Sequence, residues 1–133
     1  MKKVLLLTSR ADFGGGPEHI FQLLSHISQT YDCYVACPQD KPYYEKYITI
    51  LSPGKVLHLP HRSFHIKSLL TLSKLIKSEG IQLLHSHGKG AGLYSRLLSL
   101  LTCVPCIHTF HGLHIGSYNH FQKIIYNLYE RSA

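Results

Sequence analysis

The amino-acid sequence predicts a single α/β domain in which a Rossmann-like parallel sheet carries helices on both faces. Short apolar runs alternate with stretches of helical periodicity along all 133 residues. A glycine-rich turn follows the first apolar run, and the composition, 44% hydrophobic and 16% charged, is that of an ordinary globular protein. Strands that alternate with helices require right-handed crossovers and hence a parallel sheet. We expect the first strand to be central, with the strand order 3-2-1-4-5.

Five strands are expected, because each of five short apolar runs stops at a glycine, a proline or a polar loop. Their residue ranges are 2–8, 31–38, 55–60, 81–87 and 106–110.

The helices are predicted from apolar residues at helical spacing. Pro17 suits a first helical turn, and the first helix extends to about Thr30. Residues 41–51 form a short helix or an irregular segment, whereas Gly80 should end a helix over 66–79. The buried face of that helix is expected to hold Leu69, Leu70, Leu72 and Ile76. A Leu-rich helix over 91–101 and a last, amphipathic helix with Phe121, Ile124, Ile125 and Leu128 complete the series.

Cellular location is predicted from features that the sequence lacks. No apolar run approaches the roughly 18 residues of a membrane-spanning helix, and Met1–Leu7 is too short for a signal peptide. A cytoplasmic chain is therefore expected. Its cysteines should be reduced thiols, because they lie in or beside predicted strands. They are Cys33, Cys37, Cys103 and Cys106.

The formal charge of +7 favours an anionic partner, which could be a phosphate ligand, an anionic lipid or a nucleic acid. No helix-turn-helix, zinc finger or aromatic RNA motif is present, so a nucleic-acid partner is not expected. Anionic membrane is a second possible partner, and a merely solvated basic face is the alternative. The basic residues assigned to membrane association are Arg62, Lys67, Lys74, Lys77 and Lys123.

Three segments that follow predicted strands are the candidate ligand-binding loops: SRADFGGG, HSHGKGAG and HTFHGLH. The carboxyl ends of parallel strands meet at one edge of the sheet, where ligands bind. In the first loop, Gly14, Gly15 and Gly16 would let the backbone approach a ligand, while the following helix offers unpaired N–H groups. The alternative is that these glycines only form a tight turn.

A nicotinamide dinucleotide is disfavoured by the same loop. The dinucleotide fingerprint needs a third small residue where this sequence has His19. The acidic residue expected after the second strand could only be Asp40, which lies beyond Pro38.

The histidines near the ends of the fourth and fifth strands could form a metal site, but such a site is not expected. His85 and His87 share one face of the fourth strand, and further ligands could come from His108, His111 or His114. No zinc-binding pattern accompanies these histidines. The CVPC stretch follows a helix and precedes a strand, so the helix dipole cannot stabilise a reactive thiolate there, and a turn with inert thiols is predicted.

Taken together, FGGGPEHI, IQLLHSHGKGAGLYSRLLSLLTCVPCIHTFHGLH and FQKIIYNLYERSA resemble the amino-terminal domain of a GT-B glycosyltransferase, and the closest resemblance is to family 4, whose enzymes retain anomeric configuration. The resemblance implies a nucleotide-sugar donor, with UDP-sugar expected, a glycan or lipid-linked acceptor, and no cofactor or metal. It implies a role in the synthesis of surface polysaccharide or glycolipid, at the inner face of the cell membrane.

The resemblance also assigns residues to the site. His111 matches the residue that lies beside the transferred sugar in relatives, and it is the expected catalytic residue. The glycine loop would lie at the cleft, and the loop after the fourth strand would flank the acceptor. The expected substrate-binding residues are Gly14, Gly15, Gly16, His19, His87, Gly88, Lys89 and Gly112.

Family 4 enzymes have a second Rossmann-like domain with an E-x7-E pattern that carries most nucleotide contacts, and no such pattern occurs in residues 1–133. The expectation is thus one truncated amino-terminal domain that lacks the carboxyl-terminal nucleotide-binding domain and is inactive alone. The alternative is a non-catalytic Rossmann-like module that binds a phosphorylated or nucleotide ligand.

Overall fold

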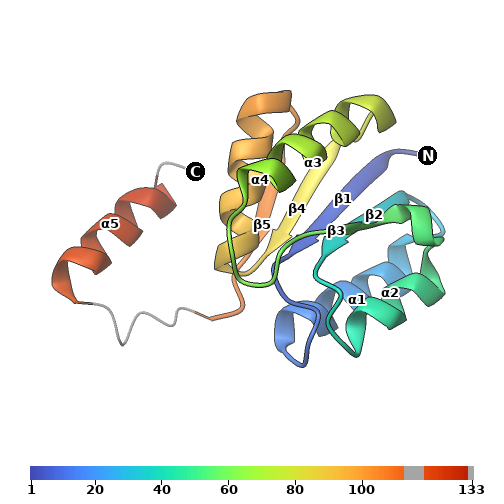
Figure 1. Ribbon diagram of the computed structural model, residues 1–133, viewed down its shortest axis with the longest axis horizontal. Helices are drawn as coiled ribbons and strands as arrows, with labels where there is room; N and C mark the ends of the chain where they lie inside the picture. The colour runs from blue at the N-terminus through green and yellow to red at the C-terminus, as the bar shows by residue number, and fades with distance from the viewer. Residues whose placement is uncertain (113–118, 132–133) are drawn as a thin grey trace.

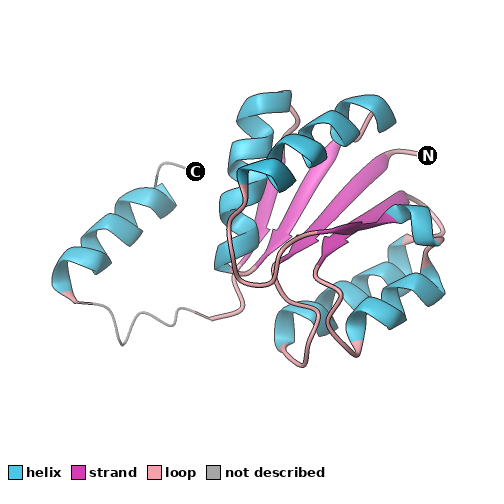
Figure 2. Cartoon of the chain, viewed as in Figure 1, coloured by secondary structure: helices cyan, strands magenta, loops and turns pink. Residues whose placement is uncertain are grey.

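The computed structural model describes residues 1–112 and 119–131, and it contains a five-stranded parallel sheet in the order β3-β2-β1-β4-β5 (Figures 1 and 2). This confirms the predicted fold class and strand order. The strands are β1 (Lys3–Thr8), β2 (Asp32–Cys37), β3 (Val56–His58), β4 (Leu83–His87) and β5 (Cys106–Thr109). The helices are α1 (Gly15–Ile27), α2 (Tyr43–Ile50), α3 (Ile66–Glu79), α4 (Lys89–Thr102) and α5 (His120–Arg131), with a 3-10 turn at Pro53–Lys55.

The sheet register aligns the ends of the three strands that carry the candidate loops. Thr8 at the end of β1 pairs with His87 at the end of β4, and His87 in turn pairs with Thr109 at the end of β5. The loops that follow these strands therefore leave the sheet at the same edge. This is the geometry that the predicted ligand site requires.

Helices cover both faces of the sheet, with α1 and α2 on one face and α3 and α4 on the other (Figure 1). Alternate residues of a strand point to opposite faces. Accordingly, Leu5 and Leu7 of β1 pack in the core beneath α3 and α4, whereas Val4 and Leu6 pack in the core beneath α1 and α2. Both faces of β1 are buried, as expected of a central parallel strand.

Helix α3 ends where the sequence predicts. Gly80 takes the left-handed conformation, with φ of 66°, and its N–H bonds the carbonyls of Ile76 and Lys77. The prediction for Leu70 is wrong, since this side chain is 52% exposed. One residue turns a helix by about 100°, so the position after the buried Leu69 lies away from the sheet.

Helix α5 lies beyond α4, away from the sheet (Figure 1). The Nη2 atom of Arg96 in α4 bonds Glu130 at 2.6 Å, and Lys89 Nζ lies 4.9 Å from the ring centre of Tyr126. The predicted apolar stripe of α5 is exposed and comprises Phe121, Ile124, Ile125 and Leu128.

Among the described residues, no helix has both the length and the apolar character that crossing a membrane requires. All four cysteines are free thiols, as expected; burial raises the pKa of Cys33 to about 11 and that of Cys37 to about 12.

Candidate functional site

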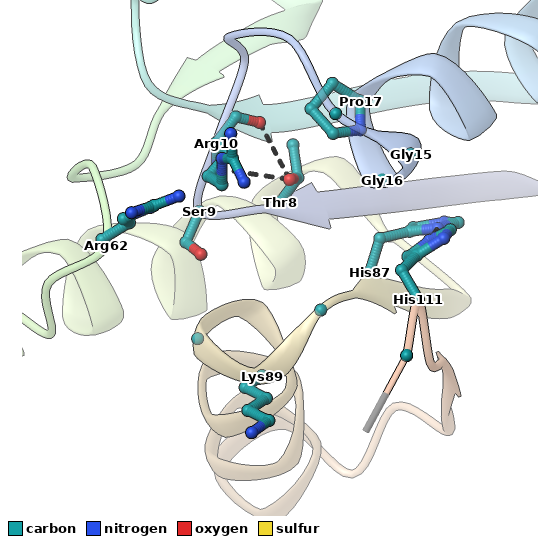
Figure 3. A pocket seen from close by; sticks show the side chains of 14 residues that line it. Thr8, Ser9, Arg10, Gly15, Gly16, Pro17, Arg62, His87, Lys89 and His111 are labelled. Atoms are coloured by element: carbon teal, nitrogen blue, oxygen red, sulfur yellow. Dashed lines mark hydrogen bonds between the residues drawn. The ribbon is translucent and has the colours of Figure 1, made fainter. Parts of the chain in front are cut away.

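A pocket of about 430 Å³ lies at the carboxyl edge of the sheet, where the three strand-end loops meet (Figure 3). Its lining comes from residues 8–10 and 14–17, from 87–90 and from 111–112, together with Arg62 from the loop after β3. Every residue assigned to the site from the sequence lines this pocket except His19, which lies close by against His87 and His111.

Two of the glycines are required by their backbone conformation. Gly88, after β4, has φ of 80°, and Gly112, after β5, has φ of 110°, a region that other residues rarely adopt. Gly14, by contrast, has φ of 165°, which is extended backbone open to any residue. The tight-turn explanation of the glycines thus fits the loops after β4 and β5 better than the loop after β1.

The glycine loop after β1 is instead distinguished by what it faces. A Cβ atom built on Gly15 would lie 3.9 Å from His111 Nδ1, and one on Gly16 would lie 3.5 Å from His111 Cδ2. Both are ordinary contact distances, so an alanine would fit, but a longer side chain would project into the pocket. The absence of side chains here keeps the space in front of His111 open.

His87 and His111 lie next to each other at one side of the pocket (Figure 3). Their Nδ1 and Nε2 atoms lie 3.1 Å apart, within hydrogen-bonding distance, and their rings stack at 5.3 Å between centres. His87 is 2% exposed, and its Nε2 has no hydrogen-bond partner among the described residues. The ring of His85 packs against His87, with 4.3 Å between centres, while its Nε2 lies 2.8 Å from Thr109 Oγ1.

His19 joins this pair from the first turns of α1. Its ring meets those of His87 and His111 edge-on, with ring centres 5.1 and 5.3 Å away, and its side chain is exposed. His108 lies elsewhere: its Nδ1 lies 2.8 Å from Ser86 Oγ, and its ring lies against Gly92 of α4. His114 falls outside the described residues.

His85, His87 and His111 are held neutral by their surroundings, which lower the pKa of each. Burial, with added repulsion from neighbouring histidines, lowers the pKa of His87 to about 2 and that of His85 to about 4. Burial and the adjacent His19 lower the pKa of His111 as well. At neutral pH these imidazoles can donate or accept hydrogen bonds without carrying charge.

Cationic groups surround the opposite side of the pocket. Arg10 Nε bonds Asp12 at 2.7 Å, and its Nη2 bonds the carbonyl of Phe13 at 2.8 Å, which braces the glycine loop. Arg62 also lines the pocket. Its backbone N–H donates to the Ser9 carbonyl at 3.0 Å, which holds the loop after β3 against the end of β1. The Lys89 side chain points away from the two histidines (Figure 3), toward Tyr126.

Thr8 was not assigned to the site from the sequence, Ser9 and Arg10 were placed in a candidate loop without a role of their own, and Arg62 was assigned to a membrane surface. The signal for Thr8, Ser9 and Arg10 was their position at the end of β1 or directly after it, at the edge where ligands bind. Arg62 follows β3, whose end lies at the same edge.

Comparison with known proteins defines the class. The family model "Glycosyltransferase Family 4" matches residues 13–133, which include the glycine loop and both histidine loops. The chain belongs to glycosyltransferase family 4. This agrees with the resemblance found in the three strand-end motifs.

One curated relative of this family 4 domain is UDP-Gal:alpha-D-GlcNAc-diphosphoundecaprenol alpha-1,3-galactosyltransferase of Escherichia coli, 42% identical over 48 residues. The match covers 35% of this chain and 12% of the relative.

Two solved structures share the fold. A glycosyltransferase from Rickettsia africae aligns over 95% of this chain and 33% of its own, with a TM-score of 0.64 and 15% identity. A Listeria monocytogenes protein assigned as a UDP-N-acetylglucosamine 2-epimerase aligns over 92% of this chain and 34% of its own, with a TM-score of 0.56 and 16% identity. The family 4 domain thus spans about a third of the length of each structure.

Proposed function

We propose that this glycosyltransferase domain is the acceptor-side half of a retaining enzyme, which transfers a sugar from a UDP-sugar to a lipid-linked acceptor. The observation that carries the proposal is the convergence of the glycine loop and two histidine loops on one pocket. A concave site with a few convergent polar groups is typical of a small-molecule site. Family membership gives that site its reaction class.

The donor and acceptor are proposed from the partial relative in Escherichia coli. Its name specifies a UDP-galactose donor and an N-acetylglucosamine unit on a diphosphate lipid. A diphosphate-linked acceptor also suits a chain with a formal charge of +7. The role that follows is the synthesis of a surface polysaccharide or glycolipid.

His111 is proposed to contact the reacting sugar through Nδ1. Its Nε2 lies 3.1 Å from His87 Nδ1, whereas its Nδ1 lies on the side of Gly15, 3.9 Å from where a Cβ atom of that residue would be. Positive charge develops on the sugar ring in glycosyl transfer. A neutral imidazole can hydrogen-bond the sugar without repelling that charge, which is why the lowered pKa of His111 suits this role.

The phosphate groups of the donor are proposed to lie toward the ends of two helices. Helix α1 begins at Gly15 and α4 begins at Lys89, both at the pocket lining. Helix N-termini carry partial positive charge and free N–H groups that favour anions. Arg62, in the lining of the same pocket, adds a full positive charge.

The remaining nucleotide contacts are proposed to come from a second domain outside residues 1–133. The family 4 domain spans about a third of the Rickettsia africae glycosyltransferase. Positioning a donor between two domains in a closed cleft contributes much of the rate in such enzymes. Residues 1–133 alone are therefore proposed to be inactive.

Attachment to the cytoplasmic face of a membrane is proposed from helix α3. Lys67, Lys74 and Lys77 are exposed there, beside the exposed Ile66 and Leu70. Each basic residue near an anionic surface is worth about 1 kcal/mol. Flotation with anionic vesicles should show binding that weakens with salt; binding unaffected by salt, or none, contradicts the proposal.

The test of the proposed function is a transfer assay with the full-length protein that contains these residues. Radiolabelled UDP-sugars, UDP-galactose among them, are offered with N-acetylglucosaminyl diphosphate polyprenol, and the anomeric configuration of the product is read by NMR. Transfer with retention is expected, and residues 1–133 alone should give none. If the full-length protein binds the nucleotide sugar but transfers nothing, the domain is a binding module.

A further inference from the structure

The guanidinium of Arg62 has no carboxylate partner in the part of the chain that the structure describes. Two other basic side chains belong to the pocket lining, and both are engaged. Arg10 pairs with Asp12 through two hydrogen bonds of 2.7 and 3.0 Å, and the Lys89 ammonium lies over the ring of Tyr126. Arg62 therefore brings an uncompensated positive charge to the pocket, and such a charge attracts anions.

The backbone of Arg62 lies in the left-handed region, with φ of 46°. Cys103 is another described residue with a side chain and a positive φ, but it ends α4, where this conformation is common. Arg62 lies in the turn after β3, where no helix ends. Left-handed backbone lowers stability for a residue with a Cβ atom, and such strain gathers at functional sites. In this conformation the Arg62 side chain points toward Ser9 and Arg10, at the pocket (Figure 3).

Two contacts hold this turn against the loop after β1. The Arg62 N–H donates to the Ser9 carbonyl at 3.0 Å. One residue earlier, His61 Nδ1 lies 2.5 Å from Asp40 Oδ2, and the same oxygen accepts a hydrogen bond from the Ala11 N–H at 3.4 Å. The Asp40 carboxylate thus joins the loops that follow β1, β2 and β3. The turn that carries Arg62 is fixed on both sides of that residue's backbone N–H.

We propose that Arg62 binds a phosphate group of a substrate, and that His61 and Asp40 are positioning residues, which hold the strained turn so that the guanidinium faces the pocket. A guanidinium binds phosphate through two parallel N–H···O bonds, so its direction must be fixed. The source of the phosphate, which is the diphosphate of the donor or that of the acceptor, rests on the proposed function. Phosphate binding itself does not, since it is measured without sugar transfer.

The first test is the binding of inorganic pyrophosphate to the full-length protein, measured by calorimetry at low ionic strength, where exposed charges are little screened. Arg62→Gly removes the guanidinium and the backbone strain together, because glycine adopts a positive φ freely. Its affinity for pyrophosphate should fall at least about 10-fold, as when hydrogen bonds to a charged group are lost. Its melting temperature should not fall, so a weaker affinity cannot be attributed to unfolding.

The matched control is Lys2→Ala, which also removes one positive charge. Lys2 is exposed and directly precedes β1, at the edge of the sheet opposite the pocket. The affinity of this variant for pyrophosphate should be unchanged. An unchanged affinity in Arg62→Gly, or an equal loss in Lys2→Ala, would overturn the proposal.

His61→Ala tests the positioning role, because His61 is exposed and its loss leaves the core intact. The substitution should weaken pyrophosphate binding when Arg62 is present and add no further loss in the Arg62→Gly background, since a positioning residue acts through Arg62. Equal losses in the two backgrounds, or no loss in either, would overturn the positioning role.

Transfer assays with the full-length protein distinguish the two sources of phosphate. Arg62→Gly should raise the KM for one substrate and leave kcat nearly unchanged. A raised KM for the UDP-sugar assigns Arg62 to the donor, and a raised KM for the diphosphate-linked acceptor assigns it to the acceptor. If neither KM changes, the proposal is overturned. If the protein transfers no sugar, the proposed function fails, whereas pyrophosphate binding that depends on Arg62 would still support this inference.

Discussion

His87 Nδ1 lies 3.1 Å from His111 Nε2, although the two residues are 24 positions apart in the sequence. The pairing follows from the parallel register of β4 and β5, which sets His87 beside Thr109 two residues before His111. It leaves His111 Nδ1, the ring nitrogen that lies nearer Gly15, outside the contact with His87. This one contact links the sheet topology to the proposed chemistry.

Replacing His111 with alanine should reduce transfer without unfolding the domain. In the full-length enzyme, His111→Ala is expected to lower kcat/KM by about 10²-fold, as when a positioned polar contact to the reacting centre is lost. Steady-state kinetics with the UDP-sugar measures this, and His58→Ala serves as the control. An unchanged rate in His111→Ala, with a loss in His87→Ala, would move the role to the loop after β4.

Acid should destabilise the fold below pH 6.5. Burial lowers the pKa of His85 to about 4, whereas an unfolded histidine titrates near 6.5. Below pH 6.5 the unfolded chain binds more protons, so stability is full above this pH and falls as the pH drops toward 4.

Chemical denaturation at several pH values between 7 and 5 measures this decline, which approaches about 1.4 kcal/mol per pH unit for each histidine kept neutral. His85→Gln can keep a bond to Thr109 but cannot titrate, so its pH slope should be shallower. Equal slopes in the two proteins would show that His85 is not the group responsible.

Gly92 should tolerate no side chain. A Cβ atom there would lie 2.9 Å from His108 Cε1, and the bond from His108 Nδ1 to Ser86 Oγ holds that ring in place. Overpacking lowers stability by about 1–3 kcal/mol. Alanine has a higher helix propensity than glycine, which restores about 1 kcal/mol of stability. Gly92→Ala should therefore lower the free energy of unfolding by up to about 2 kcal/mol.

The control for this prediction is Gly54→Ala, because no atom lies within 4 Å of a Cβ built on Gly54. Urea denaturation of the two variants gives the comparison. Equal stability of both variants would mean that α4 and β5 can separate without cost.

Strand order was predictable from the sequence for two reasons. Each strand of the sheet is a short apolar run that ends at a glycine, a proline or a polar loop, and crossovers between parallel strands are right-handed. The convergence of the glycine loop, His87 and His111 followed from that order. His19 was assigned to the site only through the family resemblance, since its position depends on how α1 packs on the sheet. Arg62 was missed for a similar reason: its placement rests on a backbone bond to Ser9, which no local pattern reveals.

We propose that the glycine loop keeps the reaction space open in front of His111, and the activity of Gly15→Leu in the full-length enzyme is the decisive measurement. Gly15 begins α1 with no positive φ, and leucine is a good helix former, so the melting temperature should not fall. Its side chain would fill the space beside His111 Nδ1, and kcat/KM should drop at least about 10²-fold, as when reacting groups are misplaced by 1 Å or more. Full activity in a stably folded Gly15→Leu enzyme would contradict the claim.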